Sequence, residues 1–255
     1  MAARFGTGTA AICGLLLGAL VLAPGCRPSR EDRVAAGATA ASSAEWEWLQ
    51  KARQRLDGER ERLARLEAAS PAAPPSPETA RLRKEVADLS AELNRRLVGF
   101  INANASESLG EPPSERQRAA IRMKSDEDAL LARQYIEQAG DYRRAIEIYE
   151  TALAADPDNE RLRQALEAAR ARRYVTPERF GRVKEGMTQD EVRRLLGPPN
   201  AQDVRSYPER GVTAWFYPKD ASGAAAAVWF HRSGDAIVAY EVDFEALQPP
   251  PPPGG

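Results

Sequence analysis

The sequence predicts an α+β protein in which a long helical part precedes a small module of helices and strands. Heptad-like spacing of apolar residues predicts helices within residues 43–104, and a helix–turn–helix pattern continues to residue 173. After Tyr174 the chain becomes rich in β-branched and aromatic residues separated by turn sequences, which predicts antiparallel strands. Helices followed by a sheet are the order typical of an α+β fold.

Composition argues against several functional classes. The chain of 255 residues has 36 basic and 37 acidic residues, so it lacks the positive charge typical of a nucleic-acid binder. Two cysteines and one histidine are too few for a Cys/His zinc site or a disulfide framework. The common nucleophile, phosphate-loop and metalloprotease motifs do not occur in the sequence. We therefore expect no catalytic residues, no metal, no cofactor and no nucleic-acid partner.

The first 25 residues resemble a bacterial lipoprotein signal peptide. Arg4 precedes an apolar run over residues 10–23, which Gly25 and Cys26 follow closely. As a helix this run spans about 21 Å, short of a hydrocarbon core of roughly 30 Å, which favours an export signal over a spanning helix. The resemblance implies cleavage between Gly25 and Cys26 and lipidation of Cys26. Plain secretion and an uncleaved anchor are the alternatives. The residue after the cysteine is Arg27 and not aspartate. By the sorting rule of enterobacterial lipoproteins, this implies the outer membrane of a Gram-negative bacterium, with the protein facing the periplasm.

A flexible tether is expected over residues 26–42, followed by a helical spacer over residues 43–104. Prolines in segment 71–77 divide the spacer into two heptad-like helices. Three arrangements fit this pattern: a hairpin, an oligomer in which the helices pair with other chains, or solvated helices that pack on their own domain. The stripe positions are 49, 52, 56, 59, 63 and 66 in the first helix and 82, 86, 89, 93, 96 and 100 in the second.

Residues 114–173 resemble a tetratricopeptide repeat with flanking helices. Gly140 begins a turn sequence, and Ala145 and Tyr149 stand where the two helices of such a repeat press together. One repeat cannot bury its own apolar face, so helices at about 114–124 and 158–173 are expected to flank it. The resemblance implies a structural spacer, with peptide binding as the alternative.

The terminal module, residues 175–247, is predicted to place two helices on a three-stranded antiparallel sheet. Thr188 and Glu191 form a capping box for a helix that ends at Gly197, where Pro198 prevents continuation. The composition of residues 212–217, 224–230 and 236–244 predicts the strands. The proline-rich tail over residues 248–255 is expected to be extended and disordered.

A set of positions in this module resembles the SmpA/OmlA (BamE-like) family of outer-membrane lipoproteins. They are Gly186, Met187, Thr188, Leu196, Gly197, Pro198, Trp215, Tyr217, Phe230 and Gly234. The resemblance implies a non-catalytic scaffold or accessory subunit of an envelope protein complex, with β-barrel assembly as a candidate process. The same fold serves other periplasmic proteins, so the alternative is an inhibitor-like binder or a non-catalytic subunit of an envelope enzyme.

Aromatic residues of the strands are the candidate partner-binding residues. Trp215 and Tyr217 share one face of a strand by alternation, and Trp229 lies on the neighbouring strand. Such large, rigid side chains are frequent at binding hot spots, although packing against the helices would also explain them. A second candidate is the segment from Arg161 to Lys184, whose eight basic residues suit an anionic lipid or an acidic partner, or a solvated helix end.

Overall fold

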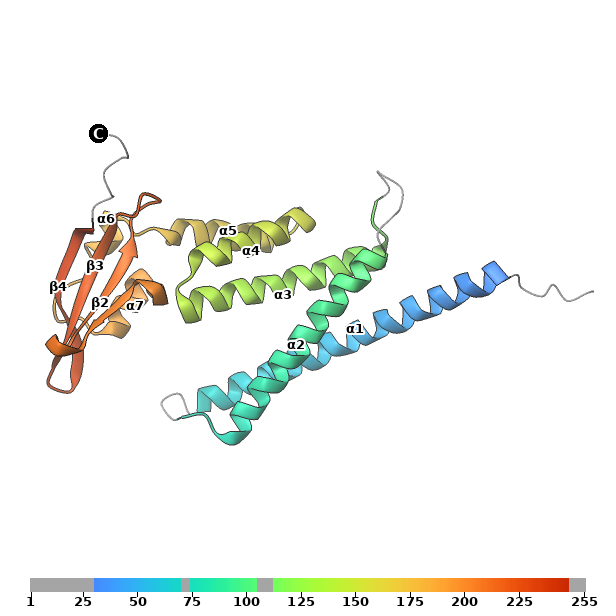
Figure 1. The fold of residues 1–255 in the computed structure, drawn as a ribbon, viewed down its shortest axis with the longest axis horizontal. Helices are drawn as coiled ribbons and strands as arrows, with labels where there is room; N and C mark the ends of the chain where they lie inside the picture. Colours follow the sequence, from blue (N-terminus) through green and yellow to red (C-terminus); the bar gives the residue numbers. More distant parts are fainter. Residues whose placement is uncertain (1–29, 70–73, 105–111, 248–255) are drawn as a thin grey trace, which may run out of the picture. The chain divides into compact units, whose positions relative to one another are not determined.

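Helices precede strands in the structure, a computed structural model that describes residues 30–69, 74–104 and 112–247, with side chains from Ser42 onward. Figure 1 follows this order from blue to red. The predicted α+β class is therefore confirmed. The signal peptide, the cleavage site, Cys26 and the proline-rich tail lie outside the described residues.

The α-helices of the described residues are α1 (Arg30–Ala69), α2 (Pro77–Ala103), α3 (Glu115–Ala139), α4 (Tyr142–Ala155), α5 (Glu160–Arg173), α6 (Pro177–Phe180) and α7 (Gln189–Leu196). Two 3-10 helices, η1 (Ala201–Asp203) and η2 (Pro208–Arg210), flank β1. The strands are β1 (Val204–Tyr207), β2 (Val212–Pro218), β3 (Ala225–Ser233) and β4 (Ala236–Leu247). Because α1 begins at Arg30, most of the expected tether is helical. Alanine, the strongest helix former, is abundant there, and no proline lies between residues 30 and 42.

Helices α1 and α2 form a hairpin through the predicted apolar stripes. Leu49 and Leu56 of α1 are buried in one cluster with Leu93, Leu97 and Phe100 of α2. Ion pairs join Glu45 to Arg96 at 3.1 Å and Glu67 to Arg83 at 2.7 Å, which fixes the antiparallel direction. Of the three arrangements that the pattern allows, this one is present within the chain. Position 96 was expected in the stripe, but the buried residue is Leu97, and Arg96 lies over the ring of Trp48.

Helix α3 is one continuous helix, whereas the sequence analysis predicts two helices in this segment, a flanking helix and then the first helix of a repeat. Ser114 caps it, since its hydroxyl accepts a hydrogen bond from the Gln117 amide at 3.2 Å. It ends at Gly140, which has φ of +62°. No glycine or proline lies between these two ends, so nothing in the sequence separates two helices. A single flanking helix, α5, follows the pair α3–α4.

A buried carboxylate joins the hairpin to α3. The side chain of Glu127 is 1% exposed and accepts hydrogen bonds from Arg53 at 2.9 Å and from Arg60 at 2.8 and 2.6 Å. Ser90 of α2 donates a further bond at 3.1 Å. Side chains of α1 and α2 thus both bind the carboxylate of Glu127 on α3. The apolar stripe pattern does not predict this contact.

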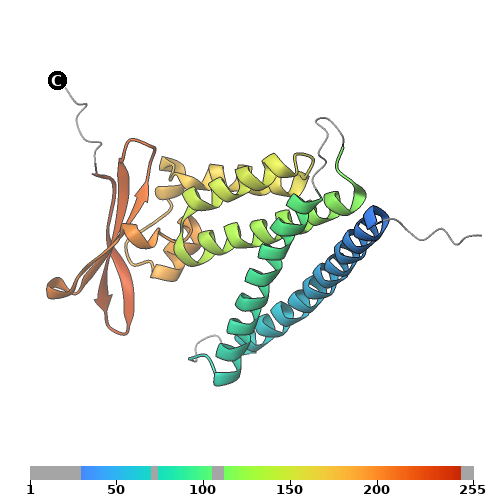
Figure 2. The ribbon, with the colours of Figure 1, turned by 45° about the vertical axis from the view of Figure 1, so that its right-hand side comes forward.

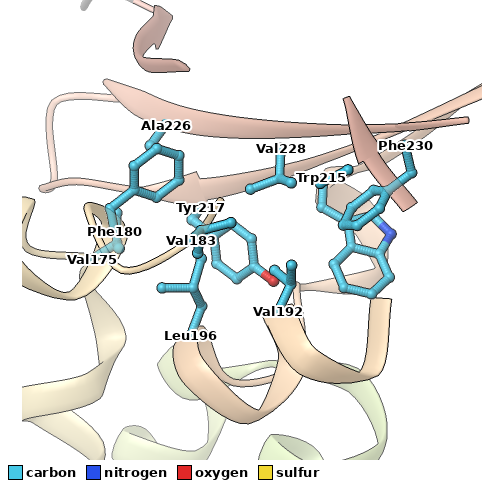
Figure 3. Close-up of a cluster of buried hydrophobic side chains, with 11 residues drawn as sticks. Val175, Phe180, Val183, Val192, Leu196, Trp215, Tyr217, Ala226, Val228 and Phe230 are labelled. Atoms are coloured by element: carbon cyan, nitrogen blue, oxygen red, sulfur yellow. The ribbon is translucent and has the colours of Figure 1, made fainter. Parts of the chain in front are cut away.

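The terminal module has four strands rather than three, in the antiparallel order β1-β2-β3-β4. The missed strand, β1, has only four residues and is followed by Pro208, so it lacks the length from which a strand is usually predicted. The capping box is confirmed, because Thr188 and Glu191 bond each other's backbone amides, and Gly197 ends α7 with φ of +89°. Side chains of α6 and α7 pack on one face of the sheet (Figure 3).

The turn between α3 and α4 contacts the loop that follows α7. A Cβ atom built on Gly140 would lie 2.4 Å from the carbonyl oxygen of Pro199, so only glycine fits there. On the other side of this contact, a Cβ built on Gly197 would lie 2.7 Å from the hydroxyl of Tyr142. The described residues from Ala44 onward accordingly form one compact unit.

Candidate functional site

Two of the three candidate partner-binding residues lie in the core of the terminal module. Trp215 is 4% exposed and Tyr217 is 5% exposed, and both point from β2 toward α7 and the segment around α6 (Figure 3). The Tyr217 hydroxyl donates a hydrogen bond to the Gly197 carbonyl at 3.3 Å, and burial raises the pKa of Tyr217. The expectation of a docking role is corrected for both residues, because helices cover their face of the sheet.

Trp229 is half-buried and belongs to the opposite face. Its ring stacks on that of Tyr207 with centroids 5.7 Å apart, and it meets the ring of Phe216 edge-on at 5.9 Å. Ala214 and Ala227 are the cross-strand partners of Trp229 and Phe216 and are fully buried, so the rings lie over small side chains. We call Tyr207, Phe216 and Trp229 the outer aromatic cluster. Among the described residues, no α-helix lies on this face (Figures 1 and 2).

A groove of 400 Å³ borders the outer aromatic cluster at the end of the sheet. It crosses all four strands, and each contributes to its lining. The lining residues are Asp203, Arg205 and Tyr207 at β1, Phe216 and Pro218 of β2, Gly223, Ala224 and Ala225 at the start of β3, and Leu247 at the end of β4. Apart from Asp203 and Arg205 the side chains are uncharged, so the groove suits a ligand that is mainly apolar.

An arginine-lined cleft of 370 Å³ lies between the helices and the terminal module. Its lining includes Arg143, Arg172, Arg173 and Arg179 against Asp203 and Asp220. Burial raises the pKa of Tyr142, which also lines this cleft, while Arg172 and Arg179 act in the opposite direction. Arg179 Nε is buried and has no hydrogen-bond partner among the described residues. The basic segment predicted from the sequence thus supplies three of the four arginines.

The positions that resemble the SmpA/OmlA family have structural roles here. Gly186, Gly197 and Gly234 have positive φ angles, which favour glycine over other residues. Leu196 and Phe230 are buried in the core, and Met187 packs against it. Thr188 is the helix cap, and Pro198 lines the arginine-lined cleft.

His231 is exposed at the end of the outer face. Its ring stacks on Tyr240 with centroids 4.9 Å apart. Across residues 30–69, 74–104 and 112–247 no three His, Cys, Asp or Glu side chains come together in a way that could hold a metal ion.

Sequence reasoning missed Tyr207 because it missed β1. Phe216 could be placed on the face opposite to Trp215 by alternation alone, but nothing in the sequence says which face the helices cover.

Within the part of the chain that the structure describes, each helix is too short or too polar to cross a membrane. Comparisons with protein-family models, with curated proteins and with solved structures found no match to this chain.

Proposed function

We propose that this chain is a non-catalytic lipoprotein that is anchored through Cys26 in the outer membrane and docks an envelope protein through the outer aromatic cluster. One observation carries the docking part: three aromatic side chains gather on a sheet face that no described α-helix covers. Tyrosine and tryptophan bury large areas at little cost in conformational entropy, so such a cluster suits a protein interface.

The sequence supports the anchoring part. A short apolar run followed by Gly25 and Cys26 suits lipidation and is too short to span a bilayer. The resemblance of the terminal module to the SmpA/OmlA family supports an accessory role in an envelope complex and makes β-barrel assembly the first process to examine. In this proposal the α1–α2 hairpin and the tetratricopeptide-like helices act as a spacer between membrane and docking face.

Anchoring is tested by the variant Cys26→Ser. Cells grown with a clickable palmitate analogue should label the unchanged chain, and the variant should be unlabelled and released from membranes. The variant Cys13→Ser is the matched control, since it removes the other cysteine inside the signal segment and should leave labelling intact. If neither the unchanged chain nor the control is labelled, that result contradicts lipid anchoring.

Docking is tested by a photo-crosslinking amino acid at His231, which is exposed on the outer face. A crosslinker at Arg194, which is exposed on α7, is the control for the opposite face. We expect an envelope protein to be captured from position 231 and not from position 194. Equal capture from both positions, or capture from position 194 alone, contradicts docking through this face.

A further inference from the structure

The groove at the end of the sheet is lined by the last described residue of the chain. Leu247 is 46% exposed and shares this groove with Tyr207, Phe216 and Ala225. The chain continues from Leu247 with Gln248, five consecutive prolines and two glycines. We propose that this groove is a binding site for a polyproline II segment and that its occupant is the chain's own tail, residues 248–255.

The length of the tail matches the width of the sheet. A tail that leaves β4 must cross three strand spacings of about 4.8 Å to reach β1, a distance of roughly 14 Å. Five prolines in a polyproline II helix extend about 3.1 Å each, or roughly 15 Å. Pro249–Pro253 can therefore span the groove from Leu247 to Arg205 without a linker.

The chemistry of proline explains why the tail should cross the face rather than lengthen the sheet. Proline has no backbone N–H, so residues 249–253 cannot donate to a neighbouring strand, and β4 stops at Leu247. A polyproline II helix makes no internal hydrogen bonds and leaves its carbonyl oxygens as acceptors. Arg205 and Tyr207 in the groove carry N–H and O–H donors that can meet them.

The apolar lining also suits this ligand. Grooves walled by aromatic side chains bind proline-rich segments because the proline rings pack on the aromatic faces and the segment loses little conformational entropy. Phe216 and Tyr207 provide the walls here, and Ala225, which is 7% exposed, leaves room between them and Leu247. Trp229 contacts both wall residues and holds their rings in place.

The inference rests on the proposed function in one respect, since the groove forms one end of the face that is proposed to dock a partner. A tail in the groove covers that end, and a partner must displace it. Because the tail is covalently joined to Leu247, which lines the groove, its effective concentration at the groove is in the millimolar range. The tail would therefore compete with any ligand of the groove in the isolated protein.

The test is binding of the synthetic peptide Gln-Pro-Pro-Pro-Pro-Pro-Gly-Gly to two detergent-solubilised forms, the full chain and a variant that ends at Leu247. With a Kd of about 100 μM for the shortened chain and an effective tail concentration of about 1 mM, the full chain should bind the peptide about tenfold more weakly. A full-length variant in which Pro249–Pro253 are replaced by serine should bind as the shortened chain does. Fluorine NMR of 5-fluorotryptophan should show a shift of the Trp229 signal on tail removal.

The groove variant Phe216→Ala should lose peptide binding in the shortened chain, whereas Leu131→Ala, at an exposed position on α3, should not. Equal binding by the full and shortened chains would mean that a partner's segment, and not the tail, fills the groove, and would overturn the inference. Absence of peptide binding by the shortened chain would overturn it as well. Neither result affects capture from position 231, so the two proposals can fail separately.

Discussion

Glu127 is a carboxylate with almost no solvent contact, and two arginines from α1 surround it. Removal of one partner from a buried ion pair leaves the other charges desolvated and unpaired, which typically costs about 3–5 kcal/mol. Arg53 and Arg60 remain partly exposed, so we expect Glu127→Gln to lower the free energy of unfolding by about 3 kcal/mol. Urea denaturation followed by circular dichroism measures this value.

The control is Glu78→Gln, which removes an ion pair with Arg62 at 2.6 Å whose two side chains are more than half exposed. Exposed pairs contribute about 0–1 kcal/mol, so this variant should remain close to the unchanged chain. If the two substitutions lower the free energy of unfolding equally, burial of Glu127 does not strengthen its ion pairs, and the prediction is wrong.

Alanine substitutions at Gly140 and Gly211 distinguish the stability cost of backbone strain from that of steric overlap. Both have φ of +62°, but a Cβ on Gly211 would meet nothing within 4 Å, whereas a Cβ on Gly140 would overlap the backbone of Pro199. Gly211→Ala should cost about 1 kcal/mol for the left-handed conformation. Gly140→Ala should cost at least about 2 kcal/mol more because the loop after α7 must move. Thermal unfolding checks both, and equal costs would contradict the contact between the helical turn and this loop.

The N-terminal cap of α7 should make the free energy of unfolding depend on pH. The Thr188 backbone amide donates to Glu191 at 2.8 Å and holds the pKa of that carboxyl below its ordinary value of 4.5. Because the folded pKa is lower than the unfolded one, this contribution is complete above about pH 4.5 and is lost as the pH falls through the folded value. Glu191→Gln should therefore be less stable than the unchanged chain at pH 6, and the difference should be smaller at pH 3. A constant difference between these pH values, measured by urea denaturation, would contradict the cap.

Elements with a local signal were predictable from the sequence. The stripe of leucines in α1 and α2, the capping box of α7 and the three longer strands follow from spacing and composition. The continuous α3 was missed because the resemblance to a repeat suggested two helices, although the sequence contains no break. Strand β1 was missed because four residues carry too little pattern.

The candidate site was predictable only in part, because it depends on which face of the sheet is covered. Alternation separates Trp215 from Phe216, but the choice of inner and outer face is made by contacts between distant residues. Val192 and Leu196 of α7 pack on the Trp215 side, and this leaves Trp229 on the other side. The groove likewise needs β1, whose Tyr207 completes the aromatic cluster.

For the whole molecule, docking of a partner through the outer aromatic cluster predicts different roles for Trp229 and Trp215. Trp229→Ala and Trp215→Ala remove the same side chain from opposite faces of the same sheet. Trp215 is in the core, so its truncation should cost about 3–5 kcal/mol of stability. Trp229 is half-buried, so its truncation should affect stability less and binding more.

The most direct test is to measure partner capture from solubilised envelope and the melting temperature for both variants, with capture reported per folded molecule. Trp229→Ala should reduce capture at least tenfold with a smaller loss of melting temperature than Trp215→Ala, which corresponds to a binding cost above about 1.4 kcal/mol. For Trp215→Ala, capture per folded molecule should stay unchanged, because only the folded fraction falls. Unchanged capture per folded molecule by Trp229→Ala would contradict docking through the outer aromatic cluster.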